Sequence, residues 1–253
     1  MRTRIIPTLL LKNESLVKTT KFNNFNYIGD PCNTIRIFNE LEVDELMLLD
    51  ITASKEGKEP NYSLLKDIAS ECFMPLSYGG GVRSVEQARQ IFKIGFEKIC
   101  INSAAFDDIN VISAISQEFG TQAVIGSIDY KKPFFGKFQV FNSSKNKFTG
   151  KNVVDWAKTL IDAGVGEILL TSIEKEGTWS GYDLQMLKLV TTVINIPLIA
   201  HGGCGKLDDI KKAVYEGGAS AVAMGNMVVY QKKGMGVLVN FPDHNELKHY
   251  IND

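Results

Sequence analysis

Glycine-rich turns follow short apolar runs at two well-separated places in the chain. The first set comprises Gly80, Gly81, Asn102 and Ser103, and the second comprises Gly202, Gly203, Gly225 and Asn226. Glycine lets the backbone come close to an anion, and the amides that open a following helix add the positive end of its dipole. A single glycine-rich turn is equally typical of an ordinary tight turn that binds no ligand. Two sets at equivalent positions predict phosphate binding and suggest a long ligand with a phosphate at each end.

Charged side chains mark the ends of other apolar runs. Asp129 closes one run, where a carboxylate could act as a general acid or base. Four charged residues instead open their runs: Arg4, Glu45, Lys98 and Glu167. By spacing alone, these four are typical of solvated charges at strand ends.

Eight apolar runs rich in β-branched residues alternate with amphipathic stretches of helical length. The runs are Ile5–Leu11, Glu45–Asp50, Pro75–Tyr78, Lys98–Asn102, Ala123–Asp129, Glu167–Ser172, Pro197–Ala200 and Ala221–Gly225. Ser84–Gly95 and Val153–Gly164 are two of the intervening helices, and each ends at a glycine. This alternation predicts a parallel sheet, and eight strands are the number that closes a (β/α)8 TIM barrel of the α/β class. An open doubly wound sheet is the alternative.

Two longer excursions leave the C-terminal ends of predicted strands, where barrel enzymes keep their chemistry. Lys12–Asp30 follows the first strand, and Tyr130–Gly150, which resembles a small hairpin, follows the fifth. No linker rich in Pro, Gly or Ser divides the chain, so we expect a single domain over residues 1–253.

The two halves of the chain repeat each other. ELMLLDITASKEG at 45–57 matches EILLTSIEKEG at 167–177, and PLSYGGGVRSVEQA at 75–88 matches PLIAHGGCGKLDDI at 197–210. Such a repeat predicts a duplicated half-barrel. Lys12 and Lys131 then correspond, so the counterpart of Asp129 is Leu10, which strand alternation points inward. Leucine cannot transfer a proton.

Composition narrows the class of protein. The chain has 253 residues, 44% hydrophobic and 23% charged, with a formal net charge of -1, which argues against a nucleic-acid or membrane-surface role. Four widely spaced cysteines without a CxxC pair favour core positions in a reducing cytosol. No signal peptide, metal site or cofactor is expected, and we expect a cytoplasmic protein.

The chain resembles the HisF family, the cyclase subunit of imidazole glycerol phosphate synthase. The resemblance rests on RIIPTLLLK, LLDITAS, GGGVRSVEQA, KICINSAA, FGTQAVIGSID, GEILLTSIEKEGTWSGYD and IPLIAHGGCGK, and it runs from about Arg4 to Tyr230 in one register. It implies a glutaminase partner, HisH, on the N-terminal barrel face. Ammonia released there crosses the barrel and reacts with a doubly phosphorylated ribonucleotide at the opposite face.

The resemblance also implies roles for individual residues. Arg4, Glu45, Lys98 and Glu167 match the ring of charges at the ammonia entrance, in which two cations and two anions neutralise each other around a polar passage. Asp129 matches one of two acid–base aspartates, and Leu10 stands where the other is expected. Lys18, Asp50 and Thr171 match positions around the ligand, and Glu176 stands in place of an aspartate. His201 replaces a small hydroxyl residue and is read either as a polar contact to substrate or as a capping residue in a loop.

Three hypotheses about the function of the chain differ in how they account for Leu10. A branch of the HisF family associated with acetamidino modification of surface-polysaccharide sugars also has an apolar pair after IIP, and acts with a HisH-like glutaminase and an ATP-dependent sugar amidotransferase. The first hypothesis places the chain in that branch. The second is a histidine-pathway cyclase that tolerates Leu10, and the third is a non-catalytic scaffold that regulates a glutaminase.

Overall fold

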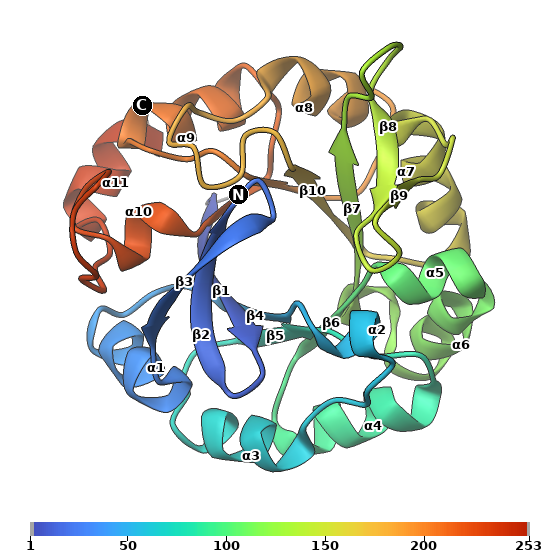
Figure 1. Ribbon diagram of the computed structural model, residues 1–253, viewed down its shortest axis with the longest axis horizontal. Helices are drawn as coiled ribbons and strands as arrows, with labels where there is room; N and C mark the ends of the chain where they lie inside the picture. Colours follow the sequence, from blue (N-terminus) through green and yellow to red (C-terminus); the bar gives the residue numbers. More distant parts are fainter. Residues whose placement is uncertain (1–2, 252–253) are drawn as a thin grey trace.

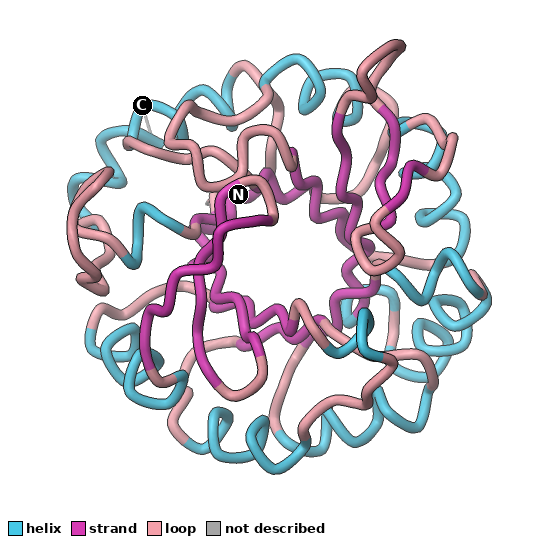
Figure 2. The backbone as a smooth tube through the Cα atoms, viewed as in Figure 1, coloured by secondary structure: helices cyan, strands magenta, loops and turns pink. Residues whose placement is uncertain are grey.

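The structure, a computed structural model, describes residues 3–251 and contains a closed barrel of eight parallel strands (Figures 1 and 2). The barrel strands are β1 (Arg4–Lys12), β4 (Leu46–Asp50), β5 (Leu76–Gly79), β6 (Lys98–Ile101), β7 (Val124–Lys131), β10 (Glu167–Ser172), β11 (Leu198–His201) and β12 (Ala221–Met224). They pair in chain order, and β12 returns to β1 to close the ring. The predicted (β/α)8 barrel is therefore confirmed, and the open doubly wound sheet is wrong.

Helices surround this ring (Figure 2). The longer ones are α1 (Pro31–Glu40), α3 (Tyr62–Ser70), α4 (Val85–Ile94), α6 (Asn110–Phe119), α7 (Val153–Ala163), α8 (Leu184–Thr191), α9 (Leu207–Tyr215) and α11 (His244–Ile251). Three shorter ones are α2 (Ala53–Glu56), α5 (Ser103–Asp107) and α10 (Asn226–Val229), and a 3-10 turn spans Thr121–Ala123. The predicted helix ends are confirmed, since Ser84 caps α4 by accepting from the Gln87 amide and Gly164 ends α7 in the left-handed region.

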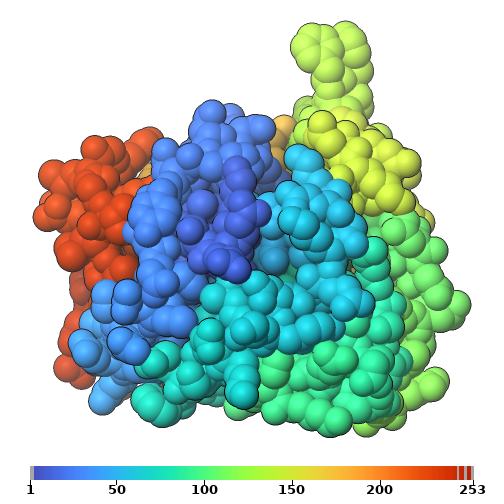
Figure 3. Space-filling model, turned by 60° about the horizontal axis from the view of Figure 1, so that its bottom comes forward, coloured from blue at the N-terminus to red at the C-terminus, as the bar shows by residue number. Residues whose placement is uncertain are grey.

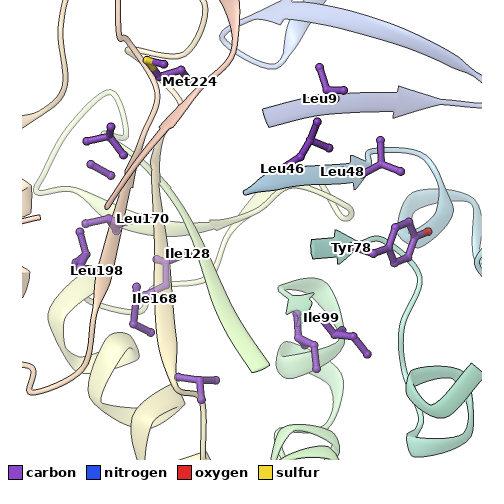
Figure 4. Close-up of a cluster of buried hydrophobic side chains, with 14 of the residues drawn as sticks. Leu9, Leu46, Leu48, Tyr78, Ile99, Ile128, Ile168, Leu170, Leu198 and Met224 are labelled. Atoms are coloured by element: carbon purple, nitrogen blue, oxygen red, sulfur yellow. The ribbon is translucent and has the colours of Figure 1, made fainter. Parts of the chain in front are cut away.

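Alternation along the strands produces two apolar layers. Residues that point outward pack against the helices, and Leu9, Leu48, Tyr78, Ile128 and Leu170 belong to this layer (Figure 4). Residues that point inward form a second cluster: Ile6, Met47, Cys100, Ile125, Leu169, Ile199, Ala221 and Ala223. The period of two residues therefore separates the helix-facing core from the interior of the barrel.

Both excursions rise from the C-terminal face of the barrel. β2 (Ser15–Thr20) and β3 (Asn23–Gly29) form a hairpin that continues the sheet from β1, which the sequence predicted only as an excursion. β8 (Gln139–Asn142) and β9 (Lys147–Phe148) form the predicted hairpin beside β7. The segment between β7 and β8 projects furthest (Figure 3), and it carries Phe134 and Phe135, which are 93% and 85% exposed.

Within residues 3–251, no helix is long and apolar enough to cross a membrane.

Candidate functional site

Four charged side chains form a closed ring at the N-terminal end of the barrel. Arg4 donates to Glu45 and to Glu167, with both nitrogen–oxygen distances at 2.7 Å. Lys98 donates to Glu167 Oε1 at 2.7 Å and lies 3.3 Å from Glu45 Oε1. Each cation thus contacts both anions, and Ser77 adds a hydrogen bond to Glu45 at 3.1 Å. The interpretation of these residues as solvated strand-end charges is therefore wrong, because each is paired and turned toward the barrel axis.

The chain places the ring by simple geometry. Each residue starts its strand or directly precedes it, and its side chain lies on the inward-pointing face. The two carboxylates are almost fully covered, with exposed side-chain fractions of 5% for Glu45 and 11% for Glu167. Covered charges of this kind are tolerated only when they are paired and hydrogen-bonded, as they are here.

An apolar layer lies above the ring. It is the inward-facing cluster that contains Ile6, Met47, Leu169 and Ile199, with small side chains at Ala221 and Ala223. An isolated ion in an apolar layer loses its hydration, so such a layer is more favourable for a small neutral molecule than for an ion.

A cavity of about 210 Å³ occupies the C-terminal end of the barrel. Its walls include eight of the predicted site residues: Asp50, Gly80, Gly81, Asn102, Ser103, Asp129, Thr171 and His201. Residues from β1, β4, β5, β6, β7, β10 and β11 meet there because parallel strands all present their carboxyl ends at one face. The sequence prediction therefore identified residues that the fold brings together.

Asp129 lies in the wall of this cavity and is 7% exposed. Its Oδ2 accepts hydrogen bonds from Asn102 Nδ2 at 2.9 Å and from Ser143 Oγ at 2.6 Å. Burial raises the pKa of Asp129 to about 6, although the two hydrogen bonds act to lower it. A carboxyl group with this pKa can exchange a proton near neutral pH, as a general acid or base must.

Leu10 lines the same cavity, on the strand opposite that of Asp129. It is 6% exposed and pairs in register with Leu49, whose side chain also lines the cavity. The inward orientation predicted from alternation along the first strand is therefore confirmed. The cavity therefore has the apolar side chain of Leu10 on its β1 side and the carboxyl group of Asp129 on its β7 side.

The glycine turns have a packing role that the sequence did not reveal. Gly80 has a φ of +136°, and a Cβ there would lie 2.6 Å from the Cβ of Asp50. Gly202 has a φ of +91°, and a Cβ there would lie 2.6 Å from the carbonyl oxygen of Ser172. The Gly81 amide donates to Ser54 Oγ at 3.1 Å. These glycines are thus required by contacts within the protein, independently of any anion.

Asp50 organises the loop beside Gly80. Its Oδ1 accepts from the backbone amides of Thr52 and Ala53 and from the Thr52 hydroxyl, at 2.8 to 3.0 Å. One carboxylate oxygen thus fixes the turn into α2, and the residue still lines the cavity.

A second, much smaller pocket lies at the ends of β11 and β12. Its volume is about 10 Å³, and it is lined by Lys18, Glu176, His201, Gly202, Gly203, Gly225 and Asn226, among others. Lys18 comes from the β2 strand and is 2% exposed. Burial lowers the pKa of Lys18, while the Glu176 carboxylate acts to raise it.

Glu176 connects the hairpin of β2 and β3 to the loop after β10. It accepts from Thr19 Oγ1 at 2.9 Å and from the Phe22 amide at 3.3 Å. Burial raises the pKa of Glu176, and Lys18 acts to lower it. Glu176 and His201 both line the large cavity and the small one, so the two pockets are adjacent.

His201 is the last residue of β11, so the interpretation as a capping residue in a loop is wrong. Its Nδ1 lies 3.1 Å from Thr171 Oγ1, and Thr171 pairs in register with Asp129. Burial lowers the pKa of His201 to about 3, and the Lys18 ammonium acts in the same direction. The imidazole is therefore neutral at physiological pH.

Several residues that line the cavity escaped the sequence prediction, among them Ser54, Lys55 and two serines of the second hairpin. Ser143 and Ser144 follow β8 and reach the cavity from the hairpin, where Ser143 holds Asp129. The hairpin itself was predicted, but no local pattern shows which of its residues returns to the cavity. No group of His, Cys, Asp or Glu in the described part of the chain is arranged to hold a metal ion.

Comparison with known proteins gives one consistent result. The family model described as "Histidine biosynthesis protein" matches residues 4–234. A Pseudomonas aeruginosa protein that bears the name imidazole glycerol phosphate synthase subunit hisF2 is 46% identical over 247 residues, which cover 98% of each chain. A Leptospira borgpetersenii HisF-named protein is 45% identical and covers 96% of each chain. A Vibrio vulnificus protein named hisF3 is 42% identical and covers 98% of this chain and 96% of its own.

Proposed function

Because the chain belongs to the histidine biosynthesis protein family, as a HisF-type subunit, we propose that it conducts ammonia to an amidation reaction. A HisH-like glutaminase docks at the N-terminal face and releases ammonia at the ring of Arg4, Glu45, Lys98 and Glu167. The amidation modifies a sugar, giving an acetamidino group for surface polysaccharide. One observation carries this proposal: the ring is complete, while the reaction cavity has Leu10 opposite Asp129.

The ring and the apolar layer together suit passage of neutral ammonia. Four nitrogen–oxygen contacts of 2.7 to 3.3 Å join the ring at the base of the barrel, where the ammonia would enter. The layer above it disfavours ammonium, because the ion would lose its hydration there. Ammonia would therefore arrive at the cavity uncharged and nucleophilic.

The cavity lacks the second proton-transfer group that a two-aspartate cyclase uses. Asp129 keeps a suitable pKa, but Leu10 offers no atom that can accept or donate a proton. A positioned acid or base typically contributes about 10²–10⁴-fold to a rate. The replacement of a catalytic carboxyl group by Leu10 supports a role in which the chain delivers ammonia but does not form the imidazole ring.

The cavity also suits a phosphorylated small molecule. Ser54, Lys55, Ser103 and Ser144 line it beside the Gly80–Gly81 turn, so three hydroxyl-bearing side chains and one ammonium lie around the cavity. These groups can donate to phosphate oxygens, and the lysine adds positive charge. The first strand resembles that of the sugar-modifying branch, which supports a sugar as the substrate. The same resemblance supports an ATP-dependent sugar amidotransferase as a partner.

A growth experiment tests the proposal. A strain that lacks the histidine-pathway cyclase is supplied with this gene and plated without histidine. We expect no growth, and the Alkaliphilus metalliredigens HisF gene, 39% identical over 229 residues, serves as the positive control. Vigorous growth with this gene would contradict the proposal.

A biochemical experiment tests the ammonia path and the scaffold hypothesis together. The purified chain is combined with a HisH-like glutaminase from the same organism, and both glutamine hydrolysis and ammonia release to solvent are measured. We expect binding and stimulation, and we expect Lys98→Ala to alter the release of ammonia while Lys93→Ala, at an exposed site on α4, does not. A chain that binds no glutaminase would contradict both partner-based functions.

A second candidate function, the histidine-pathway cyclase, is favoured by the retained geometry around Asp129 and by the names of the relatives. Turnover of the ribonucleotide substrate with ammonium salts distinguishes it, because this assay needs no partner chain.

A further inference from the structure

The connection between β7 and β8, residues 132–138, ends in two exposed aromatic rings (Figure 3). We call this segment the β7–β8 tip. Phe134 and Phe135 are 93% and 85% exposed, and their rings meet edge to face with centroids 4.6 Å apart. Single exposed apolar residues are ordinary on a protein surface, whereas adjacent ones on a projecting segment indicate an interaction site.

The base of the β7–β8 tip is anchored in the protein. Tyr130 is 1% exposed, and its hydroxyl donates to Asp183 Oδ2 at 3.1 Å. Phe138 packs edge-on against Tyr130, with ring centroids 5.7 Å apart. Pro133 and Gly136, with a φ of +113°, flank the two exposed rings and restrict the turn between them. A segment held in this way loses less conformational entropy when it binds a partner.

Positive charge surrounds the β7–β8 tip. Two carboxylates from other elements approach this region: Asp107 pairs with Lys145, and Glu174 accepts from the Lys132 backbone amide at 3.3 Å. Residues 130–151 themselves contain no aspartate or glutamate, although the chain has a formal net charge of -1. They contain six lysines: Lys131, Lys132, Lys137, Lys145, Lys147 and Lys151.

The other excursion shows that the fold does not require this charge. Lys12–Asp30 rises from the same face of the barrel and contains three lysines and two carboxylates. The excess of lysine is therefore a property of the second excursion alone. A basic surface with exposed aromatic rings at its tip is complementary to an acidic surface that contains an apolar pocket.

The β7–β8 tip is continuous with the mouth of the large cavity. β8 leads from the tip back to Ser143 and Ser144, which line the cavity. A protein bound to the tip and along β8 therefore lies beside the mouth. Ammonia that escaped from the mouth into water would take up a proton and lose its nucleophilic lone pair. The enzyme that consumes the ammonia must therefore shield this mouth from water.

We propose that the β7–β8 tip and the lysines around it dock the enzyme that consumes the ammonia, through an acidic surface of that enzyme with an apolar pocket for Phe134 and Phe135. This inference rests on the proposed function, whose ATP-dependent sugar amidotransferase it assigns to the C-terminal face. The glutaminase and the amidotransferase then bind opposite ends of one barrel.

A binding experiment with the full chain tests the aromatic contact. The probe is the purified ATP-dependent sugar amidotransferase from the same organism, and biolayer interferometry measures its affinity. We expect Phe134→Ser combined with Phe135→Ser to weaken binding by about 30-fold or more. Phe73→Ser is the control, because Phe73 is 88% exposed but precedes β5 at the opposite end of the barrel, and it should change affinity by less than about twofold.

A matched pair of charge variants tests the basic surface. We expect Lys132→Glu combined with Lys137→Glu to weaken binding by about tenfold at low salt, and to reduce the dependence of affinity on salt. Lys66→Glu combined with Lys93→Glu makes the same change in net charge at exposed sites on α3 and α4, and should alter affinity by less than about twofold. Thermal unfolding of each variant confirms that it is folded.

The outcomes separate this inference from the proposed function. Equal affinity of the wild-type chain and the double Phe variant for the amidotransferase would overturn the docking site and leave ammonia delivery standing. A wild-type chain that stimulates the glutaminase but does not bind the amidotransferase would do the same. Binding to vesicles of phosphatidylcholine and phosphatidylglycerol that the double Phe variant loses would assign the tip to a membrane and overturn the inference. Ammonia delivery itself fails only in the separate test of Lys98→Ala with the glutaminase.

Discussion

The two ends of this barrel are built from the same strands but differ in how completely their charges are matched. At the N-terminal base, two cations and two anions contact one another in a closed ring. At the C-terminal mouth, Asp129 is held by Asn102 and Ser143, and Leu10 lies on the opposite strand.

This difference indicates that the two ends of the barrel have different functional requirements. A base that admits ammonia needs a balanced ring, and removal of one member would leave the other three covered charges with a net charge that is not neutralised. The cyclase chemistry that the resemblance implies uses two aspartates on opposite strands, and here Leu10 stands opposite Asp129. The base is thus complete for its proposed task, while the mouth is incomplete for the histidine-pathway reaction.

The largest effect is expected from Leu10→Asp. The substitution restores a carboxyl group opposite Asp129, so ammonium-dependent turnover of the cyclase substrate should rise by about 10²–10⁴-fold. The measurement is steady-state turnover with the ribonucleotide and an ammonium salt. Leu49→Asp is the matched control, because Leu49 lines the same cavity beside Leu10 and should give no gain. A folded Leu10→Asp variant without added activity would show that the mouth lacks more than one carboxylate.

The next effect concerns the base. Glu45→Gln removes a charge that contacts Arg4 and Lys98, so the free energy of unfolding should fall by about 3 kcal/mol in urea titrations. Glu71→Gln is the control. Its partner Arg36 has a side chain that is 57% exposed, so solvent screens the pair and the loss there should be much smaller than at Glu45. Equal losses in the two variants would mean that the ring does not stabilise the base.

A smaller effect is expected at the mouth from Gly80→Ala. The new Cβ would lie 2.6 Å from Asp50 Cβ at a φ of +136°, so the free energy of unfolding should fall by about 2 kcal/mol. Gly57→Ala is the control, because a Cβ at Gly57 meets no atom within 4 Å and carries only the cost of a left-handed φ, about 1 kcal/mol. If Gly57→Ala proves the more damaging change, the close packing at Gly80 is not what requires glycine.

The smallest effect is the pH dependence of stability that Asp129 introduces. Its pKa in the folded chain is raised to about 6, from an ordinary value of 3.8, so folding is favoured below pH 4 and loses this contribution as the pH rises through 6. Relative to Asp129→Asn, the wild-type chain should lose at least about 1 kcal/mol between pH 4 and pH 7. Urea unfolding of both proteins across this range measures the difference. A constant difference would mean that Asp129 titrates at its ordinary pKa.

Much of this molecule could be predicted from local patterns in the sequence. The alternation of apolar runs with helical stretches identified the eight strands, and the period of two residues along the first strand placed Leu10 inward, because that period depends only on the extended backbone. The internal repeat located Leu10 as the counterpart of Asp129 without any knowledge of the fold. The types of side chain at Arg4, Glu45, Lys98 and Glu167 were likewise visible, although by spacing alone they indicated solvated charges.

The contacts between distant residues depend on closure of the barrel and on the paths of its loops. Only the closed sheet brings four strand starts within hydrogen-bonding distance, which turns separate charges into a ring. Only the return of the second hairpin places Ser143 on Asp129, and only the first hairpin delivers Lys18 to the end of β12. These contacts join residues far apart in the chain, and their distances depend on loop paths that no local period encodes. The sequence alone thus determined which side chains face inward, and the tertiary structure decided which of them meet.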